Sequence, residues 1–177
     1  LRDAEEEAGL PAAHTRFGAR IQKLHQPDQL TGRLYAEHLV QTGNRDAART
    51  LLSRLLREQP QNRAIRRELV EVLLAQGRGD DALASVRSGQ LLHRFDTEWL
   101  LLEARIHSGR DQFAEAITAV QQALRIRPDD ERLHELLGRL RLRANSRDLA
   151  LAAFEEALQL QPNLPSLREY VEFLKAS

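Results

Sequence analysis

Residues Glu131–Pro162, with the sequence ERLHELLGRLRLRANSRDLALAAFEEALQLQP, decide the fold of this chain. Apolar residues recur in this stretch every three or four positions, and a short polar segment around Asn145 interrupts them. Such spacing predicts two amphipathic helices joined by a turn. The pattern then recurs in the preceding sequence at a fixed interval, so the period of the chain has to be established before any single motif is interpreted.

The common interval is about 34 residues, and four residue types agree on it. The alanines are Ala48, Ala82, Ala116 and Ala150; the glycines Gly9, Gly43 and Gly77; the aspartates Asp46, Asp80 and Asp148; the prolines Pro60, Pro128 and Pro162. An alanine suits a close helix crossing, and a glycine suits the left-handed residue that ends a helix. Aspartates at the start of each second helix are expected to cap N–H groups, and prolines to stop that helix.

These spacings resemble the tetratricopeptide repeat, a helix–turn–helix unit of about 34 residues. Within the quoted stretch the resemblance rests on the dipeptide Leu137-Gly138 and on Ala150, Phe154, Ala157 and Pro162. It covers most of the chain and implies an all-α, right-handed α-solenoid of helix-turn-helix repeats with a C-terminal capping helix. It also implies a binding role, without cofactor or catalysis, in a piece of a larger protein.

In this register, four repeats are expected at residues 29–62, 63–96, 97–130 and 131–164, followed by the capping helix at 165–177. The second helix of the first repeat is expected near Arg45–Glu58. Residues 1–28 are expected to form either a partial half-repeat, with a helix at 12–25, or a short acidic lead segment. The third repeat departs most from the family pattern because Gly109 comes two residues before the expected position. We therefore expect its first helix, Thr97–His107, to be about half a turn short and to be followed by a longer turn.

The composition argues for a helical binding module and against other classes. Of the 177 residues, 42% are hydrophobic and only 5% are aromatic, which favours helices over strands. The 26 basic and 26 acidic side chains balance, and this balance with few aromatic residues argues against a nucleic-acid binder. No apolar run approaches the roughly 18 residues of a membrane span. The chain has no cysteine, and its six histidines form no metal or catalytic motif.

The family resemblance implies that positions 2, 5, 9, 12 and 13 of each first helix line a concave groove. The polar residues there, the candidate partner-binding residues, are Arg33, Glu37, Arg67, Glu71, Arg105, Arg132, Glu135, Arg139 and Arg143. Arg33 with Glu37, and Arg67 with Glu71, are spaced for pairing along one helix. The later repeats carry more arginine, which suits carboxylates or phosphates. The groove is therefore expected to become more basic toward its C-terminal end, unless these arginines only solvate the helix surface.

The function predicted from the sequence is a non-catalytic scaffold that binds a peptide segment or partner domain in this groove, an acidic partner being one option. The lysine and asparagine clamp of the family members that bind chaperone tails is missing, because those positions hold Arg33 and Glu37 in the first repeat and Leu101 and Arg105 in the third. Two alternatives stay open at this point. The chain could be the accessory module of a larger enzyme or secretion machine, or it could self-associate through apolar repeat ends.

Overall fold

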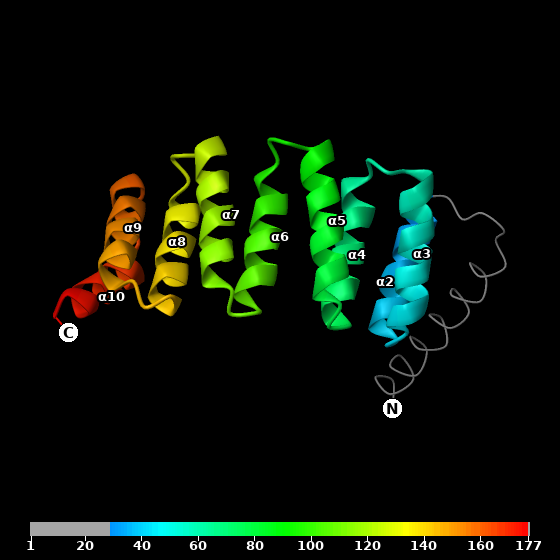
Figure 1. Cartoon of the computed structure of the whole chain (residues 1–177), viewed down its shortest axis with the longest axis horizontal. Coiled ribbons are helices and arrows are strands. Elements are labelled where there is room, and N and C mark those ends of the chain that lie inside the picture. The colour runs from blue at the N-terminus through cyan, green and yellow to red at the C-terminus, as the bar shows by residue number, and fades with distance from the viewer. Residues whose placement is uncertain (1–28, 177) are drawn as a thin grey trace, which may run out of the picture. The chain divides into compact units, whose positions relative to one another are not determined.

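The computed structural model describes residues 29–176, so the helix expected at 12–25 and the half-repeat around it lie outside the described residues. All of the regular elements within 29–176 are α-helices (Figure 1). They are α2 Gln29–Gln41, α3 Arg45–Glu58, α4 Arg63–Ala75, α5 Gly79–Leu92, α6 Thr97–Ser108, α7 Phe113–Ile126, α8 Glu131–Arg143, α9 Arg147–Leu160 and α10 Pro165–Ala176.

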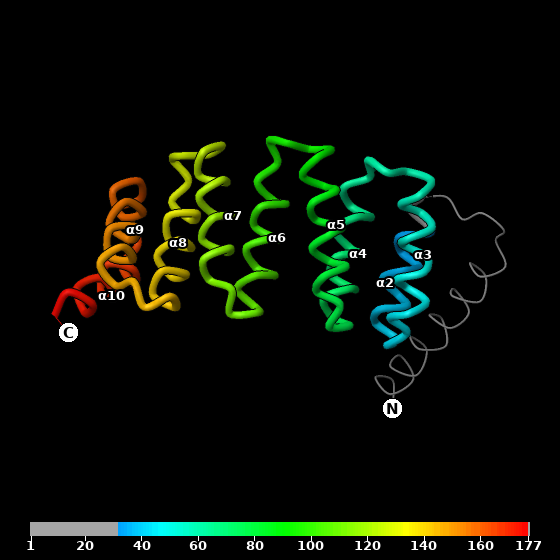
Figure 2. The backbone as a smooth tube through the Cα atoms, in the orientation of Figure 1, coloured from blue at the N-terminus to red at the C-terminus, as the bar shows by residue number. Residues whose placement is uncertain are grey.

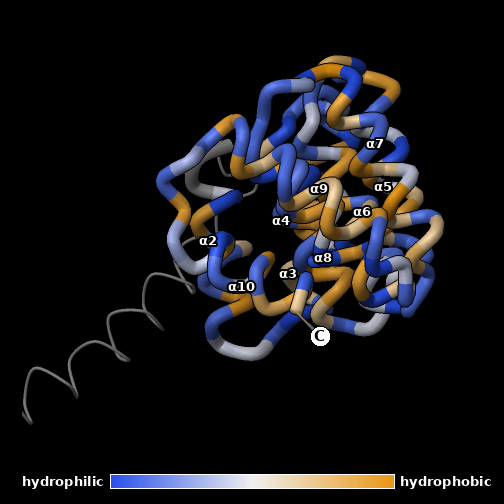
Figure 3. Tube along the Cα trace, turned by 90° about the vertical axis from the view of Figure 1, so that its left-hand side faces the viewer, coloured by the Kyte–Doolittle hydropathy of each residue, from blue (hydrophilic) through white to orange (hydrophobic). Residues whose placement is uncertain are grey.

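The helices keep the period that the sequence predicts. The second helices of the repeats, α3, α5, α7 and α9, are each 14 residues long, and each begins one repeat period after the one before. The first helices, α2, α4, α6 and α8, begin at the same interval. The hydropathy colouring of Figure 3 alternates between hydrophobic and hydrophilic along the helices, as amphipathic helices require.

The chain divides into two compact units, with the boundary inside α5 between Ser85 and Val86. In the first unit, α2 packs against α3 and α3 against α4. In the second unit, α6, α7, α8 and α9 lie side by side in chain order, and α10 packs on α9 (Figure 2). Each unit therefore stacks helices against their neighbours in sequence, which is the arrangement of a helical repeat.

The four alanines of the repeat register are completely buried. Around Ala150, a core of α9 and α10 contains Phe154, Leu167, Val171 and Leu174. The predicted packing role of the alanines is confirmed, because only a small side chain lets two helix backbones approach so closely. On the last helix, Leu167, Val171 and Leu174 are buried, whereas Tyr170 is exposed and its ring contacts Phe154 edge-on at 5.8 Å.

The third repeat keeps the register better than the sequence suggested. Backbone φ is positive at Gly43, Gly77, Asp111 and Asn145, which are equivalent positions of the four repeats, whereas Gly109 has an ordinary right-handed φ of −69°. The expectation of a shorter first helix and a longer turn is confirmed in direction, because α6 has 12 residues and Gly109 as its C-cap, whereas α2, α4 and α8 have 13 residues each. Helix α6 reaches Ser108, and Asp111 adopts the left-handed conformation, which aspartate tolerates better than most residues.

Helix capping also differs from the expectation. The N-cap of α3 is Asn44, whose side chain accepts a hydrogen bond from Ala47 N, and Asp46 lies within the first turn of the helix. The first helices carry their own periodic caps at Asn62, Asp96 and Asp130, each accepting from a backbone N–H of the first turn. Asp46 and Asp148 instead occupy first-turn positions of the second helices, where a negative charge favours the helix dipole.

The prolines that follow the second helices accept hydrogen bonds from a side chain six residues later. Arg66 Nη2 lies 2.5 Å from Pro60 O, His134 Nε2 lies 2.8 Å from Pro128 O, and Arg168 Nη2 lies 2.6 Å from Pro162 O. Each contact fixes the start of one helix to the end of the helix before it. The corresponding pair in the remaining repeat junction is Arg94 and Leu100, so this junction lacks both the proline and the polar side chain.

Candidate functional site

The predicted binding residues all lie on the first helices of the repeats. Arg33 and Glu37 lie on α2; Arg67 and Glu71 on α4; Arg105 on α6; and Arg132, Glu135, Arg139 and Arg143 on α8. The structure brings three of them together in the first unit, where Arg33, Glu37 and Glu71 line one pocket. Arg67 belongs to the same helix as Glu71 but is not among the residues that line this pocket.

This pocket, which we call the α2–α4 pocket, has a volume of about 520 Å³. Its floor is apolar and consists of Ala36, Val40, Leu52, Val72 and Ala75. Ala36, Leu52 and Val72 are buried, while Val40 and Ala75 reach the surface. Its charged rim consists of Arg33, Glu37, Arg45, Glu68 and Glu71. An apolar floor inside a charged rim is the usual composition of a site that binds part of another molecule.

Glu68 is the residue of this rim that the sequence interpretation missed. The Arg33 guanidinium pairs with it across the two helices, with Arg33 Nε 2.8 Å from Glu68 Oε1. The sequence predicted that Arg33 pairs with Glu37 on its own helix, and this was wrong because the neighbouring first helix presents a closer carboxylate. The equivalent of Arg33 in the next repeat is Arg67, and Glu68 lies one position beyond it, so a search restricted to equivalent positions does not find the pair.

Burial raises the pKa of the Glu68 carboxyl above its usual value. The positive charge of Arg33 lowers this pKa, the negative charge of Glu37 raises it, and the charge of Arg67 lowers it. The raised pKa shows that loss of solvent outweighs the nearby positive charge. The α2–α4 pocket therefore holds one carboxyl group whose ionised form is disfavoured by burial.

The arginines of α8 are engaged in contacts within the second unit. Arg139 pairs with Glu135 one turn away on the same helix. Arg143 donates to Ser108 Oγ at 2.8 Å and lies 3.2 Å from a carboxylate oxygen of Asp111. The Arg143 guanidinium also lies over the Phe113 ring, 4.7 Å from its centroid. These contacts hold Arg143 to the α6–α7 turn, so much of the expected positive charge is neutralised within the chain.

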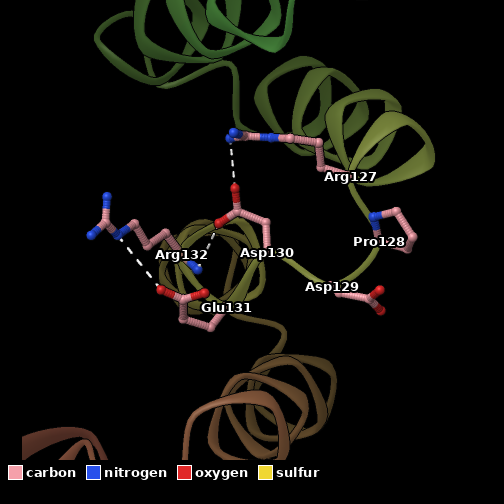
Figure 4. A pocket seen from close by; sticks show the side chains of 6 residues that line it. All are labelled: Arg127, Pro128, Asp129, Asp130, Glu131 and Arg132. Carbon is pink, nitrogen blue, oxygen red and sulfur yellow. Dashed lines mark hydrogen bonds and ion pairs between the residues drawn. The ribbon is translucent and has the colours of Figure 1, made fainter.

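A second pocket of about 450 Å³ lies at the α7–α8 turn and is lined by residues 127–132 (Figure 4). Arg127 Nη2 lies 2.6 Å from Asp130 Oδ2, while Asp130 Oδ1 accepts from the backbone N–H of Arg132. Arg132 Nε lies 3.6 Å from Glu131 Oε1. Figure 4 shows Asp129 pointing away from these pairs. The charged groups here stabilise the turn and the start of α8.

Neither a metal site nor a membrane span occurs in the described part of the chain. Within 29–176, no three His, Cys, Asp or Glu side chains are grouped as ligands for a metal ion. Buried His107 instead has its Nδ1 2.9 Å from Gln112 Oε1 and its Nε2 3.9 Å from Glu103 Oε1. None of the helices described combines the length and the apolar character that crossing a membrane requires.

Comparison with known families decides the identity of the repeat. Residues 39–106 and 101–165 match two family models, each described as tetratricopeptide repeat, and together they span residues 39–165. The chain belongs to the tetratricopeptide repeat family. No curated protein matches this tetratricopeptide repeat protein. Tetratricopeptide repeats support a general role as a protein-interaction scaffold, and this role holds for the chain.

Solved structures share the fold at low sequence identity. A thermophilic tetratricopeptide repeat protein of Thermus thermophilus has a TM-score of 0.64 at 20% identity, over 100% of this chain and 97% of that one. The structure of MamA from Desulfovibrio magneticus RS-1, from residue 41 to the end, has a TM-score of 0.67 at 17% identity. The match covers 92% of this chain and 94% of that one. A tetratricopeptide repeat protein of Parabacteroides merdae ATCC 43184 has a TM-score of 0.67 at 19% identity, and the match covers 80% of this chain and 57% of that one. The fold class predicted from the sequence, an all-α helical-repeat solenoid, is confirmed.

Proposed function

We propose that this tetratricopeptide repeat protein is a non-catalytic scaffold that holds a peptide segment of a partner protein in the α2–α4 pocket. The single observation that carries the proposal is the composition of this pocket. Two first helices of neighbouring repeats supply most of its charged rim and most of its apolar floor. The pocket volume of about 520 Å³ lies within the range of about 300–1,000 Å³ that is typical of ligand sites.

Ala75→Trp tests this proposal. Ala75 is exposed and lines the pocket, so an indole there fills the pocket without replacing a buried core residue. Peptides selected from a random dodecamer library on the wild-type chain are expected to lose at least tenfold in affinity for this variant. Ala152→Trp, at an exposed position of α9, is the matched control and should bind these peptides normally. Equal binding to Ala75→Trp and to the wild type would contradict the proposal.

The proposal also includes an acidic partner that binds along α6 and α8, and fewer observations support this second site. The arginines of these helices include Arg105 and Arg132, which are exposed, and Arg132 Nε lies 3.6 Å from Glu131 Oε1. Arg139 and Arg143 already bind carboxylates of the chain, so an acidic peptide has to displace Glu135 or Asp111 to reach them. For this reason we place the principal site in the first unit.

Self-association is a second candidate function, and exposed apolar residues at the end of α5 favour it. Leu91 is 75% and Phe95 86% exposed, with Leu92 between them also exposed. Large apolar side chains grouped on a surface mark contacts between proteins. Light scattering should show a mass that rises with concentration, and Leu91→Ser with Phe95→Ser should abolish that rise. A monomeric mass at every concentration would contradict self-association.

A further inference from the structure

The rim of the α2–α4 pocket contains more acidic than basic groups, although the whole chain has no net charge. Three carboxylates, those of Glu37, Glu68 and Glu71, line the pocket together with the guanidinium groups of Arg33 and Arg45. Net charge in a partly enclosed site selects ligands of the opposite sign, because the field of the rim acts on them before and after contact. The pocket is therefore complementary to a cation rather than to an acid.

The Arg33 guanidinium is committed to Glu68, at 2.8 Å, and both side chains are less than half exposed. Glu37 and Glu71 occupy equivalent positions of successive repeats, one on α2 and one on α4. Both are exposed, and both line the pocket. They present carboxylates from the two first helices that form the rim.

The state of Glu68 supports the same conclusion. Burial raises the pKa of its carboxyl, and the negative charge of Glu37 adds to this effect, against the opposing charges of Arg33 and Arg67. A further positive charge placed in the pocket would stabilise the ionised Glu68 and lower this pKa. A bound cation would therefore act on Glu68 in the same direction as Arg33 and Arg67.

We propose that the α2–α4 pocket receives a lysine or arginine side chain of the bound peptide, with its aliphatic stem on the apolar floor and its cationic group between the carboxylates of Glu37 and Glu71. This inference rests on the function proposed above. Long basic side chains bury their methylene groups along apolar surface while keeping the charge near water or a carboxylate. Val40 and Ala75, which reach the surface at the floor, provide that apolar path.

Other side chains fit this pocket less well. An aspartate or glutamate would meet three carboxylates and would compete with Glu68 for Arg33. A purely apolar side chain would cover the floor but would remove solvent from Glu68 without supplying a positive charge. A basic side chain satisfies the floor and the rim together.

The test uses the dodecamer peptides selected on the wild-type chain, and the peptide that binds best is synthesised with a fluorescein label. Dissociation constants are measured by fluorescence anisotropy. The selected peptides should be enriched in lysine or arginine beside an aliphatic residue. Norleucine in place of the key lysine keeps the stem and removes the charge, and should weaken binding about tenfold or more, because charge pairs at partly desolvated sites exceed the value of exposed ones.

In the protein, the double variant Glu37→Gln with Glu71→Gln should weaken binding of the lysine peptide by a similar factor and should leave binding of the norleucine peptide unchanged. The matched control is Glu156→Gln with Glu169→Gln, which removes the same charge from exposed positions of the second unit. Thermal melts of all variants in the same buffer confirm that they are folded. The difference between the two peptides should shrink at high salt.

The named outcomes separate the two proposals. If the selected peptides do not bind Ala75→Trp but carry acidic or only apolar residues, the proposal of a bound basic side chain is contradicted. The proposed scaffold function is then retained. The same holds if the Glu37 and Glu71 variant binds the lysine peptide as tightly as the wild type. Peptides that bind Ala75→Trp normally, or a library that yields no binder, overturn both proposals.

Discussion

At the scale of single residues, the size of one side chain on one helix is matched to a neighbour on the next. A Cβ atom added to Gly138 would lie 2.4 Å from Phe154 Cε1, and one added to Gly89 would lie 2.6 Å from Trp99 Cδ2. The large aromatic rings occupy the space that these glycines leave open. Gly89, which stands where the last two repeats have Ala123 and Ala157, is thus explained by buried Trp99 in the following first helix.

Ala150→Leu should destabilise the chain by about 1–3 kcal/mol through overpacking. Ala150 is completely buried against Phe154 and α10, and the added atoms have no space there. Ala152→Leu makes the same change at an exposed position of the same helix, and should alter stability by less than about 0.5 kcal/mol. Urea denaturation measures both. Equal stability of the two variants would show that the register is misassigned.

Gly138→Ala should also destabilise, by about 1–3 kcal/mol, although alanine favours a helix by up to about 1 kcal/mol over glycine. The clash with the Phe154 ring outweighs the gain in helix propensity. Gly109→Ala is the matched case, since Gly109 is right-handed and its nearest neighbour atom lies at 3.4 Å. That variant should gain about 0.4–1 kcal/mol. Thermal melts should show a lower melting temperature for Gly138→Ala and a higher one for Gly109→Ala than for the wild type.

Glu68→Gln should become more stable, relative to the wild type, as the pH rises above the ordinary carboxyl pKa of 4.5. A carboxyl with a raised pKa stabilises the folded state at low pH, where it is protonated, and loses this contribution as the pH rises through its folded pKa. Glutamine imitates the protonated form at every pH. Urea denaturation between about pH 4 and 7 measures the difference, with Glu156→Gln as an exposed control. A difference that declines with pH would contradict the raised pKa.

At the scale of helices and turns, the ends of the elements carry the repeat as regularly as their cores. Asn62, Asp96 and Asp130 cap successive first helices, and a side chain six residues after each of three prolines holds the previous helix end. At the remaining junction, the equivalent position is occupied by Leu100, which belongs to an apolar cluster with Ala123 and Leu133. Leu100 therefore packs toward the two following helices, α7 and α8.

Asp130→Ala should cost about 1–2 kcal/mol, because Asp130 accepts from the N–H groups of Arg132 and Leu133 and pairs with Arg127. Asp129→Ala removes the same charge from the neighbouring exposed residue and should change stability by less than about 0.5 kcal/mol. Thermal melts of the two variants separate capping from net charge. Equal losses would show that the charge, and not the cap, stabilises α8.

At the scale of the whole molecule, equal numbers of acidic and basic side chains conceal local differences. The α2–α4 pocket has more carboxylates than guanidinium groups, while α8 carries several arginines. Electrostatic preference for a partner therefore belongs to each surface and not to the net charge.

Arg105→Glu with Arg139→Glu should weaken the binding of an acidic peptide, such as fluorescein-labelled decaglutamate, more than tenfold at low salt. The effect should shrink toward 1 M salt, where the Debye length is about 3 Å. Arg57→Glu with Arg125→Glu changes the net charge equally at exposed positions of second helices, and should weaken binding less. Anisotropy titrations compare the pairs. Equal weakening would assign the effect to net charge alone.

The sequence by itself determined the helices, their period and the buried alanines. Helix boundaries depend on local signals, and a period repeated four times makes those signals consistent, so the predicted bounds of Arg45–Glu58 agree with the structure to the residue. Even so, the sequence points to Asp46 as the cap where the structure has Asn44, because both residue types favour a helix start and only the backbone geometry shows which side chain reaches the N–H groups.

The tertiary structure alone decided the pairing of Arg33 with Glu68, the attachment of Arg143 to the α6–α7 turn, and the left-handed conformation of Asp111. Long charged side chains have many rotamers, and which partner they reach depends on the offset between packed helices rather than on spacing along the chain. The α2–α4 pocket depends on this offset too. A residue one position outside the repeat register, Glu68, therefore completes a site that the periodicity of the sequence does not reveal.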